Sequence, residues 1–232
     1  MTDIILSRRG TIDKYMGDCI MAFWNAPLDD AAHGEHACAS ALAMLAALDR
    51  LNAALEAEAV AAEQIFHALH VGIGLNTGQC VVGNMGSDQR FDYSAIGDPV
   101  NLASRLEGQS KTYDVGVVIS ESTLATVPGW AAIELDLIVV HGKEEAIRIY
   151  ALLGDDSIAS SEAFAHLRAT HDEMLAAYRQ RRWADVYVAI DLCRPLEPRL
   201  AHFYDVYAAR IARFMVDPPP QDWNGVFVAE SK

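Results

Sequence analysis

The stretch YSAIGDPVNLASRLE, residues 93–107, decides the fold and gives the first clue to function. It reads as a short apolar strand, a Gly-Asp turn and a helix that carries Asn101 and Arg105 four residues apart. Positions i and i+4 share a helix face, so an amide that can orient a sugar and a guanidinium that can grip a phosphate point into the same space. The stretch therefore predicts a nucleotide site.

The composition of the chain limits the classes of protein to which it can belong. A chain of 232 residues with 52% apolar and 22% charged residues is long enough for one well-buried domain and a smaller appendage. A formal net charge of -14 argues against nonspecific nucleic-acid binding, which needs clustered Lys and Arg. The four cysteines form no CxxC pair, so neither a zinc ribbon nor a disulfide framework is indicated, and a reducing cytosol is the simpler setting. The longest apolar stretch, residues 37–48, is shorter than the roughly 20 residues that span a bilayer.

Patterns along the first two thirds of the chain predict mixed helices and strands. Helices are expected over residues 1–9, from Asp29 or Asp30 to about 58, after Gly97, and briefly over 121–125. In the helix after Gly97, Asp98 is expected to be the N-cap and Pro99 to occupy the first helical position. Strands are expected over 11–16, 19–24, 69–75, 78–83, 93–96, 115–120, 131–140 and 146–153. The first two strands form a hairpin with Asp18 at its tip, and the whole predicts an α+β fold.

The last third of the chain has a different composition. We expect a domain over 1–153, a linker over 154–159, a helical extension of two or three helices over 160–216, and a Pro-rich tail over 217–232. The helical extension is either a tetratricopeptide-like partner site or a support that packs on the first domain. The end of the tail, DWNGVFVAESK, is either a docked strand or a loose segment.

Three motifs in the first domain resemble the class III nucleotide cyclases, in the same order and at fitting separations. They are GTIDKYMGDCIMAFWNAP at 10–27, HVGIGLNTGQCVVGNMG at 70–86, and the opening stretch. The resemblance covers roughly residues 1–153. It implies a ferredoxin-like cyclase domain that acts as a head-to-tail homodimer with active sites at the interface. It also implies cyclisation of a nucleoside triphosphate, in which the ribose 3'-hydroxyl attacks the α-phosphorus and pyrophosphate leaves.

The resemblance implies a role for each matching residue. Asn101 would orient the ribose and Arg105 would stabilise charge at the α-phosphate. Family members hold two divalent metals, Mg²⁺ or Mn²⁺, with two aspartates, and Asp18 matches the second of these. In the dimer, Asp18 would come from one protomer and the other site residues from its partner.

Choice of the base would rest on Lys14 and Ser94, which match the purine-reading pair of the family. A lysine can donate to an adenine ring nitrogen and a hydroxyl can accept from the exocyclic amine, so ATP fits better than GTP. Ser94 departs from the usual Asp or Thr. The triphosphate-binding lysine segment reads His141-Gly142-Lys143, in which His141 takes the first lysine position, so Lys143 is the candidate phosphate ligand.

A second departure concerns the start of the chain. The family's first strand, with the other metal aspartate, is expected before Met1, so the sequence reads as an N-terminally incomplete cyclase domain of a bacterial receptor type. Any membrane contact would come through such upstream segments, and the chain itself is expected to be cytoplasmic. Two hypotheses follow: an adenylate cyclase that makes cyclic AMP for signalling, or a catalytically silent cyclase-homology module that binds nucleotide or a partner.

Two further patterns in the sequence have other, more ordinary explanations than a ligand site. The segment HGEHAC at 33–38 has metal-like spacing, but a polar turn at a helix start is favoured because no second cluster completes a site. The segment GIGLNTG at 72–78 resembles GxGxxG, but its third glycine falls one residue late, which disfavours a dinucleotide site.

Overall fold

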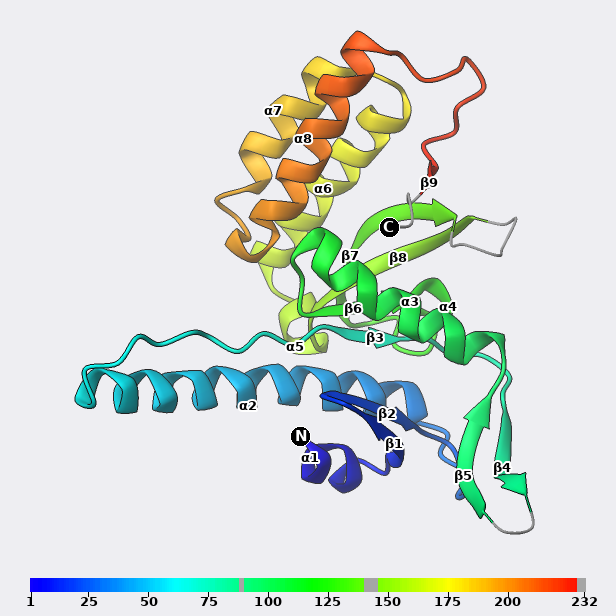
Figure 1. The fold of residues 1–232 in the computed structure, drawn as a ribbon. Helices are drawn as coiled ribbons and strands as arrows, with labels where there is room; N and C mark the ends of the chain where they lie inside the picture. Colours follow the sequence, from blue (N-terminus) through cyan, green and yellow to red (C-terminus); the bar gives the residue numbers. More distant parts are fainter. Residues whose placement is uncertain (88–89, 140–145, 229–232) are drawn as a thin grey trace.

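The computed structural model describes residues 1–87, 90–139 and 146–228 of the chain (Figure 1). The helices are α1 (Thr2–Ser7), α2 (His33–Ala61), α3 (Asp98–Tyr113), α4 (Glu121–Leu124), α5 (Asp156–Ala159), α6 (Glu162–Arg179), α7 (Trp183–Cys193) and α8 (Ala201–Val216), with a 3-10 turn at Pro198–Leu200. The strands are β1 (Thr11–Met16), β2 (Cys19–Phe23), β3 (Ile73–Leu75), β4 (Val81–Ser87), β5 (Arg90–Ile96), β6 (Val117–Ser120), β7 (Ala131–Val139), β8 (Ala146–Gly154) and β9 (Phe227–Val228).

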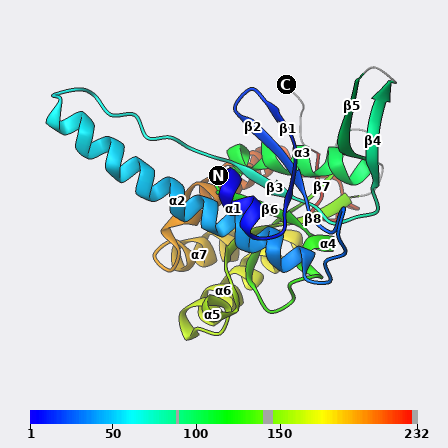
Figure 2. The same cartoon turned by 90° about the horizontal axis from the view of Figure 1, so that it is seen from below.

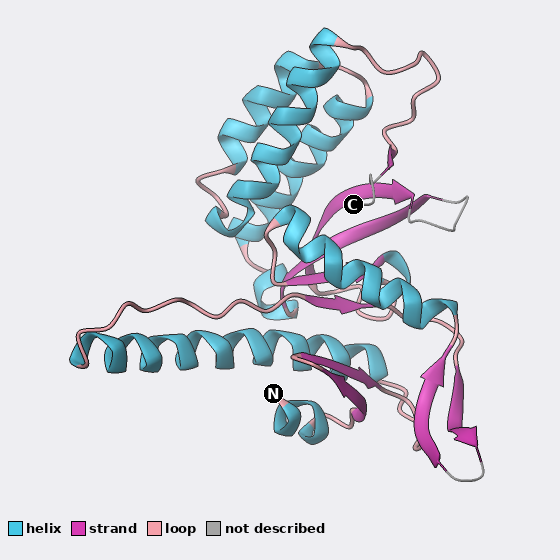
Figure 3. Cartoon of the chain, viewed as in Figure 1, coloured by secondary structure: helices cyan, strands magenta, loops and turns pink. Residues whose placement is uncertain are grey.

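A five-stranded sheet in the order β3-β6-β8-β7-β9 forms the centre of the fold, and two hairpins, β1-β2 and β4-β5, stand beside it (Figure 3). Strand β3 is parallel to β6, and β8 is antiparallel to both of its neighbours, β6 and β7. The expected α+β architecture is therefore present. The strand expected over 69–75 is shorter than predicted, because residues 62–72 instead run back along the projecting end of α2 (Figures 1 and 2). There the Asn52 amide exchanges two 2.9 Å hydrogen bonds with the backbone of Leu69.

Strand β6 is buried on both faces, which explains its apolar run VVI before the buried Ser120. Because side chains alternate along a strand, Val118 faces one core while Val117 and Ile119 face the other. The second core is closed by α2, whose Cys38 and Ala41 pack there. The sheet thus has a helical cover on each side.

The helical extension belongs to the same core as the five-stranded sheet. Helices α6 and α8 pack with α3 over one face, and their buried residues form one cluster with those of β7 and β8. Of the two interpretations of the extension, packing on the first domain is the one observed. The division of the chain into domains stays a prediction. The tail is docked, because β9 pairs with β7 and Trp223 packs against Tyr178 and Phe214.

Helix α2 begins at His33, later than expected, and its N-cap is Ala32 rather than Asp29 or Asp30. Asp30 still organises the turn, since its carboxylate accepts from the Ala32 amide at 3.2 Å and contacts His36 Nδ1 at 2.7 Å. By length and composition alone α2 is also long and apolar enough to cross a membrane, a test that the core helix of a soluble protein passes as well.

Candidate functional site

The β1-β2 hairpin carries two of the predicted site residues. Gly17 and Asp18 form its two-residue turn between the paired residues Met16 and Cys19, and Gly17 has a φ of 65°, which a glycine adopts without strain. Asp18 is therefore exposed at the tip, as predicted. Lys14 lies before the turn, within β1.

Lys14 and Ser94 are 80 residues apart in the sequence and meet in space. Lys14 Nζ donates to Ser94 Oγ at 3.3 Å, which joins β1 to β5. Ser94 is 4% exposed, whereas the Lys14 side chain is 42% exposed, so the hydroxyl is fixed while the ammonium reaches solvent. The pair predicted to read a base is thus assembled within one chain.

A cleft of about 270 Å³ opens beside this pair. Its polar lining includes Lys14, Ser94 and Asn101, and its apolar lining includes Met21 and Val100. A largely apolar cleft with a few polar groups in its lining is the usual arrangement for a small-molecule site. A second hollow of about 290 Å³ lies along α6, around Phe164 and Arg168, and contains none of the predicted site residues.

The fold fixes helix α3 tightly against β3. Gly74 makes this possible, because a Cβ atom there would lie 2.2 Å from the backbone oxygen of Ala103. At the start of the helix the Asn76 amide donates to the carbonyl of Pro99 at 3.0 Å, and Ser122 in turn donates to Asn76 Oδ1 at 3.1 Å. The beginning of α3 is therefore held from two neighbouring segments.

The N-cap of α3 is Gly97, with a φ of 145°, and the helix begins at Asp98. The prediction that Asp98 caps the helix was wrong by one residue: Asp98 lies inside the first turn, where a carboxylate interacts favourably with the helix dipole. Asn101 is exposed and Arg105 is half-buried one turn further on. Within residues 1–87, 90–139 and 146–228, neither side chain makes a hydrogen bond or ion pair, so both polar ends are available to a ligand.

The residues present do not by themselves fit a divalent metal pair. Asp18 contributes one exposed carboxylate, and the described part of the chain has no group of three His, Cys, Asp or Glu side chains that could hold a metal. The HGEHAC segment agrees with the polar-turn interpretation, because His36 is engaged by Asp30 and Cys38 is fully buried. Burial raises the pKa of Cys38 to about 12, so its thiol stays protonated and is a poor ligand. His141 and Lys143 lie outside the described residues.

Sequence reasoning missed two residues that organise the site. One is Asn76, whose side-chain amide donates to the backbone at the start of α3. Asp13 was not singled out at all, yet its Oδ2 accepts from Ser94 Oγ at 2.7 Å and from the Ala95 amide at 3.0 Å. No local pattern marks Asp13, because its partners are more than 80 positions away.

The comparisons with known proteins agree with the fold. The family model described as the adenylate and guanylate cyclase catalytic domain matches residues 6–154. The chain therefore belongs to the adenylate and guanylate cyclase catalytic domain family. It is 35% identical over 154 residues to adenylate cyclase 1 of Rhizobium meliloti (strain 1021), an alignment that covers 66% of this chain and 22% of that protein.

Two solved structures are similar over about the same region. The adenylyl cyclase CyaB from P. aeruginosa has a TM-score of 0.57 and 33% identity, covering 66% of this chain and 76% of that one. The guanylyl cyclase Cya2 has a TM-score of 0.54 and 31% identity, covering 66% and 75%. The expected cyclase fold is thereby confirmed, and the family is one of metal-dependent nucleotide cyclases. Because both base specificities occur among the similar structures, the choice of base must be argued from this chain's own residues.

Proposed function

We propose that this chain is the catalytic portion of an adenylate cyclase, which converts ATP to 3',5'-cyclic AMP and pyrophosphate. The observation that carries the proposal is the cleft lined by Lys14, Ser94 and Asn101 in a chain of the cyclase family. In the reaction the ribose 3'-oxygen forms a bond to the α-phosphorus, the bond from that phosphorus to the bridging oxygen breaks, and the hydroxyl proton is released.

Each predicted site residue has a chemical task in this proposal. Lys14 donates to an adenine ring nitrogen and Ser94 accepts from the exocyclic amine. Asn101 orients the ribose so that its 3'-hydroxyl faces the α-phosphate. Arg105 stabilises the charge that develops on the phosphate oxygens, and Lys143 contacts the triphosphate.

The proposed assembly is a head-to-tail homodimer with its active sites at the interface. Asp18 of one protomer would then face the nucleotide held by Lys14, Ser94, Asn101 and Arg105 of its partner. Mg²⁺ or Mn²⁺, two per site, is the proposed cofactor, and when bound it would supply charge neutralisation at the phosphates. One carboxylate does not complete such a site.

The direct test is formation of cyclic AMP and cyclic GMP by the purified chain with Mg²⁺ or Mn²⁺, alone and when extended by any in-frame upstream coding segment. Cyclic AMP from either form supports the proposal. The absence of product from both would favour the second candidate, a silent cyclase-homology module, for which the single carboxylate at Asp18 is the specific observation.

The role of Arg105 is tested by Arg105→Ala. Loss of a transition-state contact should reduce kcat by about 10² or more without a comparable change in folding stability. The matched control is Arg168→Ala, because Arg168 is 64% exposed on α6 and far in sequence from the cleft. Equal turnover in the two variants would contradict the assignment.

Base reading is tested by Lys14→Glu combined with Ser94→Cys. A carboxylate at position 14 accepts from the ring N–H and amino group of guanine, so the preference should move towards GTP. The measurement is the ratio of kcat/KM for ATP to that for GTP. A ratio that stays with ATP would remove Lys14 and Ser94 from the recognition of the base.

A further inference from the structure

Strand β1 contains a β-bulge at Asp13. Ile12 pairs with Ala22 and Lys14 pairs with Met21, so Asp13 is the extra residue of its strand. In a regular strand successive side chains point to opposite faces, and a bulge relaxes this alternation. The bulge explains how the neighbours Asp13 and Lys14 both reach Ser94 on β5.

The Asp13 carboxylate is completely enclosed, with a side chain that is 0% exposed. Its Oδ2 atom accepts from Ser94 Oγ at 2.7 Å and from the Ala95 amide at 3.0 Å, while Oδ1 lies 3.1 Å from Lys14 Nζ. Burial by itself would raise the pKa of Asp13. The hydrogen bonds from Ser94 and Ala95 together with the Lys14 ammonium hold that pKa below its ordinary value, so the group stays ionised and acceptor-only.

An acceptor-only neighbour decides what the serine hydroxyl can do. A hydroxyl has one proton to donate, and in Ser94 that proton is engaged by Asp13 in a short, charge-assisted hydrogen bond. The remaining lone pairs of Oγ can then only accept, as they do here from Lys14. Ser94 therefore behaves as a fixed acceptor at the edge of the cleft.

We propose that Asp13 is a specificity-determining positioning residue, which makes Ser94 an obligatory acceptor and so favours adenine over guanine. The inference rests on the proposed function of the cleft and extends it to a residue outside the lining. At the 6-position adenine presents an amine, which donates, whereas guanine presents a carbonyl oxygen, which accepts. A serine whose proton is held by Asp13 can accept from the adenine amine, but it cannot donate to the guanine carbonyl oxygen.

A purely structural role for Asp13 makes different predictions. If the carboxylate only tied β1 to β5 through the Ala95 amide, its loss would weaken folding and the binding of both nucleotides alike. If it sets the direction of the Ser94 proton, its loss must change the ratio of the two affinities. The ratio must also depend on Ser94 being present.

The test is calorimetric binding of 3'-deoxy-ATP and 3'-deoxy-GTP to the full chain with Mg²⁺, since neither probe has the attacking hydroxyl. Asp13→Ala should lower the preference for the adenine probe about tenfold, the usual weight of one oriented hydrogen bond. In a Ser94→Ala background the same change should alter the ratio less than about threefold, because the group through which it acts is gone.

Two more variants keep the outcome clear if Asp13→Ala folds poorly. Asp13→Asn retains an oxygen that accepts from both Ser94 and Ala95, so it should keep the ratio within about threefold. Asp13→Ser can either donate or accept, so it should lower the ratio by at least about threefold. Asp49→Asn, at an exposed aspartate on α2, is the matched control and should change nothing.

Failure of the inference and failure of the proposed function look different. If the unchanged protein binds neither probe, the nucleotide site is wrong and the role of Asp13 is overturned with it. If the unchanged protein prefers the adenine probe and the folded Asp13→Ala or Asp13→Ser protein keeps the same ratio, the function stands and the inference is overturned. A change of equal size with and without Ser94 would also overturn it.

Discussion

Two aspartates of this chain, Asp13 in β1 and Asp136 in β7, have almost the same immediate partners. Both side chains are enclosed, at 0% and 1% exposed. Each carboxylate accepts a 2.7 Å hydrogen bond from a hydroxyl far away in the sequence, Ser94 for Asp13 and Tyr113 for Asp136. The same local chemistry is therefore used in two regions, one at the cleft and one inside the molecule.

The difference lies in the cation of each group. Lys14 donates to the Ser94 hydroxyl from 3.3 Å with its side chain 42% exposed, whereas Arg210 donates to the Tyr113 hydroxyl from 3.1 Å with its side chain 6% exposed. An exposed ammonium can exchange its partners for water or a ligand, but a buried guanidinium cannot without a large desolvation cost. Solvent access of the cation therefore separates a potential binding group from a structural one.

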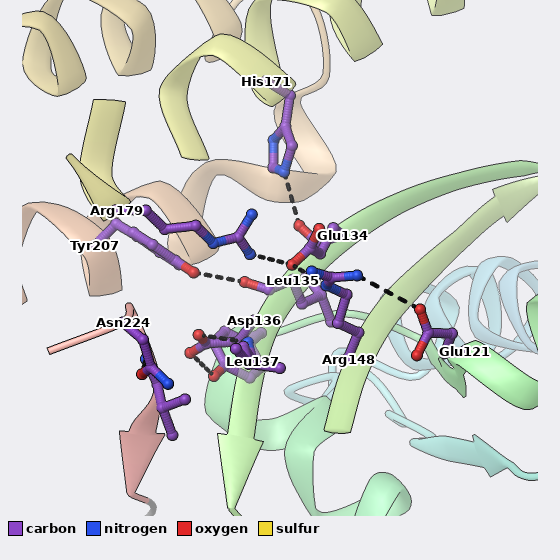
Figure 4. A network of polar contacts seen from close by, with 12 residues as sticks. Glu121, Glu134, Leu135, Asp136, Leu137, Arg148, His171, Arg179, Tyr207 and Asn224 are labelled. Carbon is purple, nitrogen blue, oxygen red and sulfur yellow. Dashed lines mark hydrogen bonds and ion pairs between the residues drawn. The ribbon is translucent and has the colours of Figure 1, made fainter. Parts of the chain in front are cut away.

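The structural group connects three parts of the fold. Tyr113 ends α3, Asp136 lies in β7 and Arg210 comes from α8 of the helical extension. Nearby, Tyr207 donates to the carbonyl of Leu135 and Arg179 pairs with Glu134 (Figure 4). The extension is thereby fixed to the sheet and to the helix that carries Asn101 and Arg105.

The largest effect is expected from Arg210→Ala. The change leaves the Asp136 carboxylate buried without its cation, which should lower the free energy of unfolding by about 3–5 kcal/mol. Urea denaturation measures this loss, and Arg213→Ala, an exposed arginine on the same helix, is the control with an expected change within about 0.5 kcal/mol. A loss for Arg210→Ala as small as that of the control would mean that the buried pair is not structural.

The structural group can also be tested through the pH dependence of stability. This dependence should come from His171, which is buried beside that group. Its Nε2 donates to the Glu134 carbonyl at 2.7 Å (Figure 4), and burial lowers its pKa from 6.5 to about 4. As the pH drops from about 6.5 to about 4, His171 becomes protonated in the unfolded chain but stays neutral in the folded chain. The free energy of unfolding therefore falls over this range, by about 3 kcal/mol at most.

Urea denaturation across this pH range should show that His171→Gln removes most of the decline. The glutamine amide can still donate to the Glu134 carbonyl, so the variant isolates the titration of the ring. His166→Gln, an exposed histidine on the same helix, is the matched control. The assignment is wrong if the decline with falling pH is the same in the unchanged protein and in His171→Gln.

The smallest effect on stability is expected from Lys14→Ala. An ion pair with a half-exposed ammonium contributes about 0.2–1 kcal/mol, so the free energy of unfolding should fall by no more than that. The same variant should weaken binding of 3'-deoxy-ATP, because the ammonium that faces the cleft is lost. A loss of stability comparable to that of Arg210→Ala would erase the distinction between the two groups.

Local rules were enough to predict the elements that display the site. The Gly17-Asp18 turn, the strand that ends near Ile96 and the helix with Asn101 and Arg105 follow from turn chemistry and helical periodicity. The same rules failed over residues 69–72, where an apolar run pairs with no strand, because the amide of Asn52 holds the backbone of Leu69 along α2. The docking of the tail was left open by the sequence, since it depends on the free edge of β7.

The sequence by itself determined the family, the order of the elements and the side chains offered to a nucleotide, because these depend on residue type and short spacing. Only the tertiary structure decided which carboxylate stands behind Ser94 and which one is sealed under α8. Asp13 and Ser94 are 81 positions apart, and Asp136 and Arg210 are 74 apart. Contacts over such separations depend on a bulge in β1 and on the packing of a helical bundle against the sheet, neither of which leaves a periodic trace in the sequence.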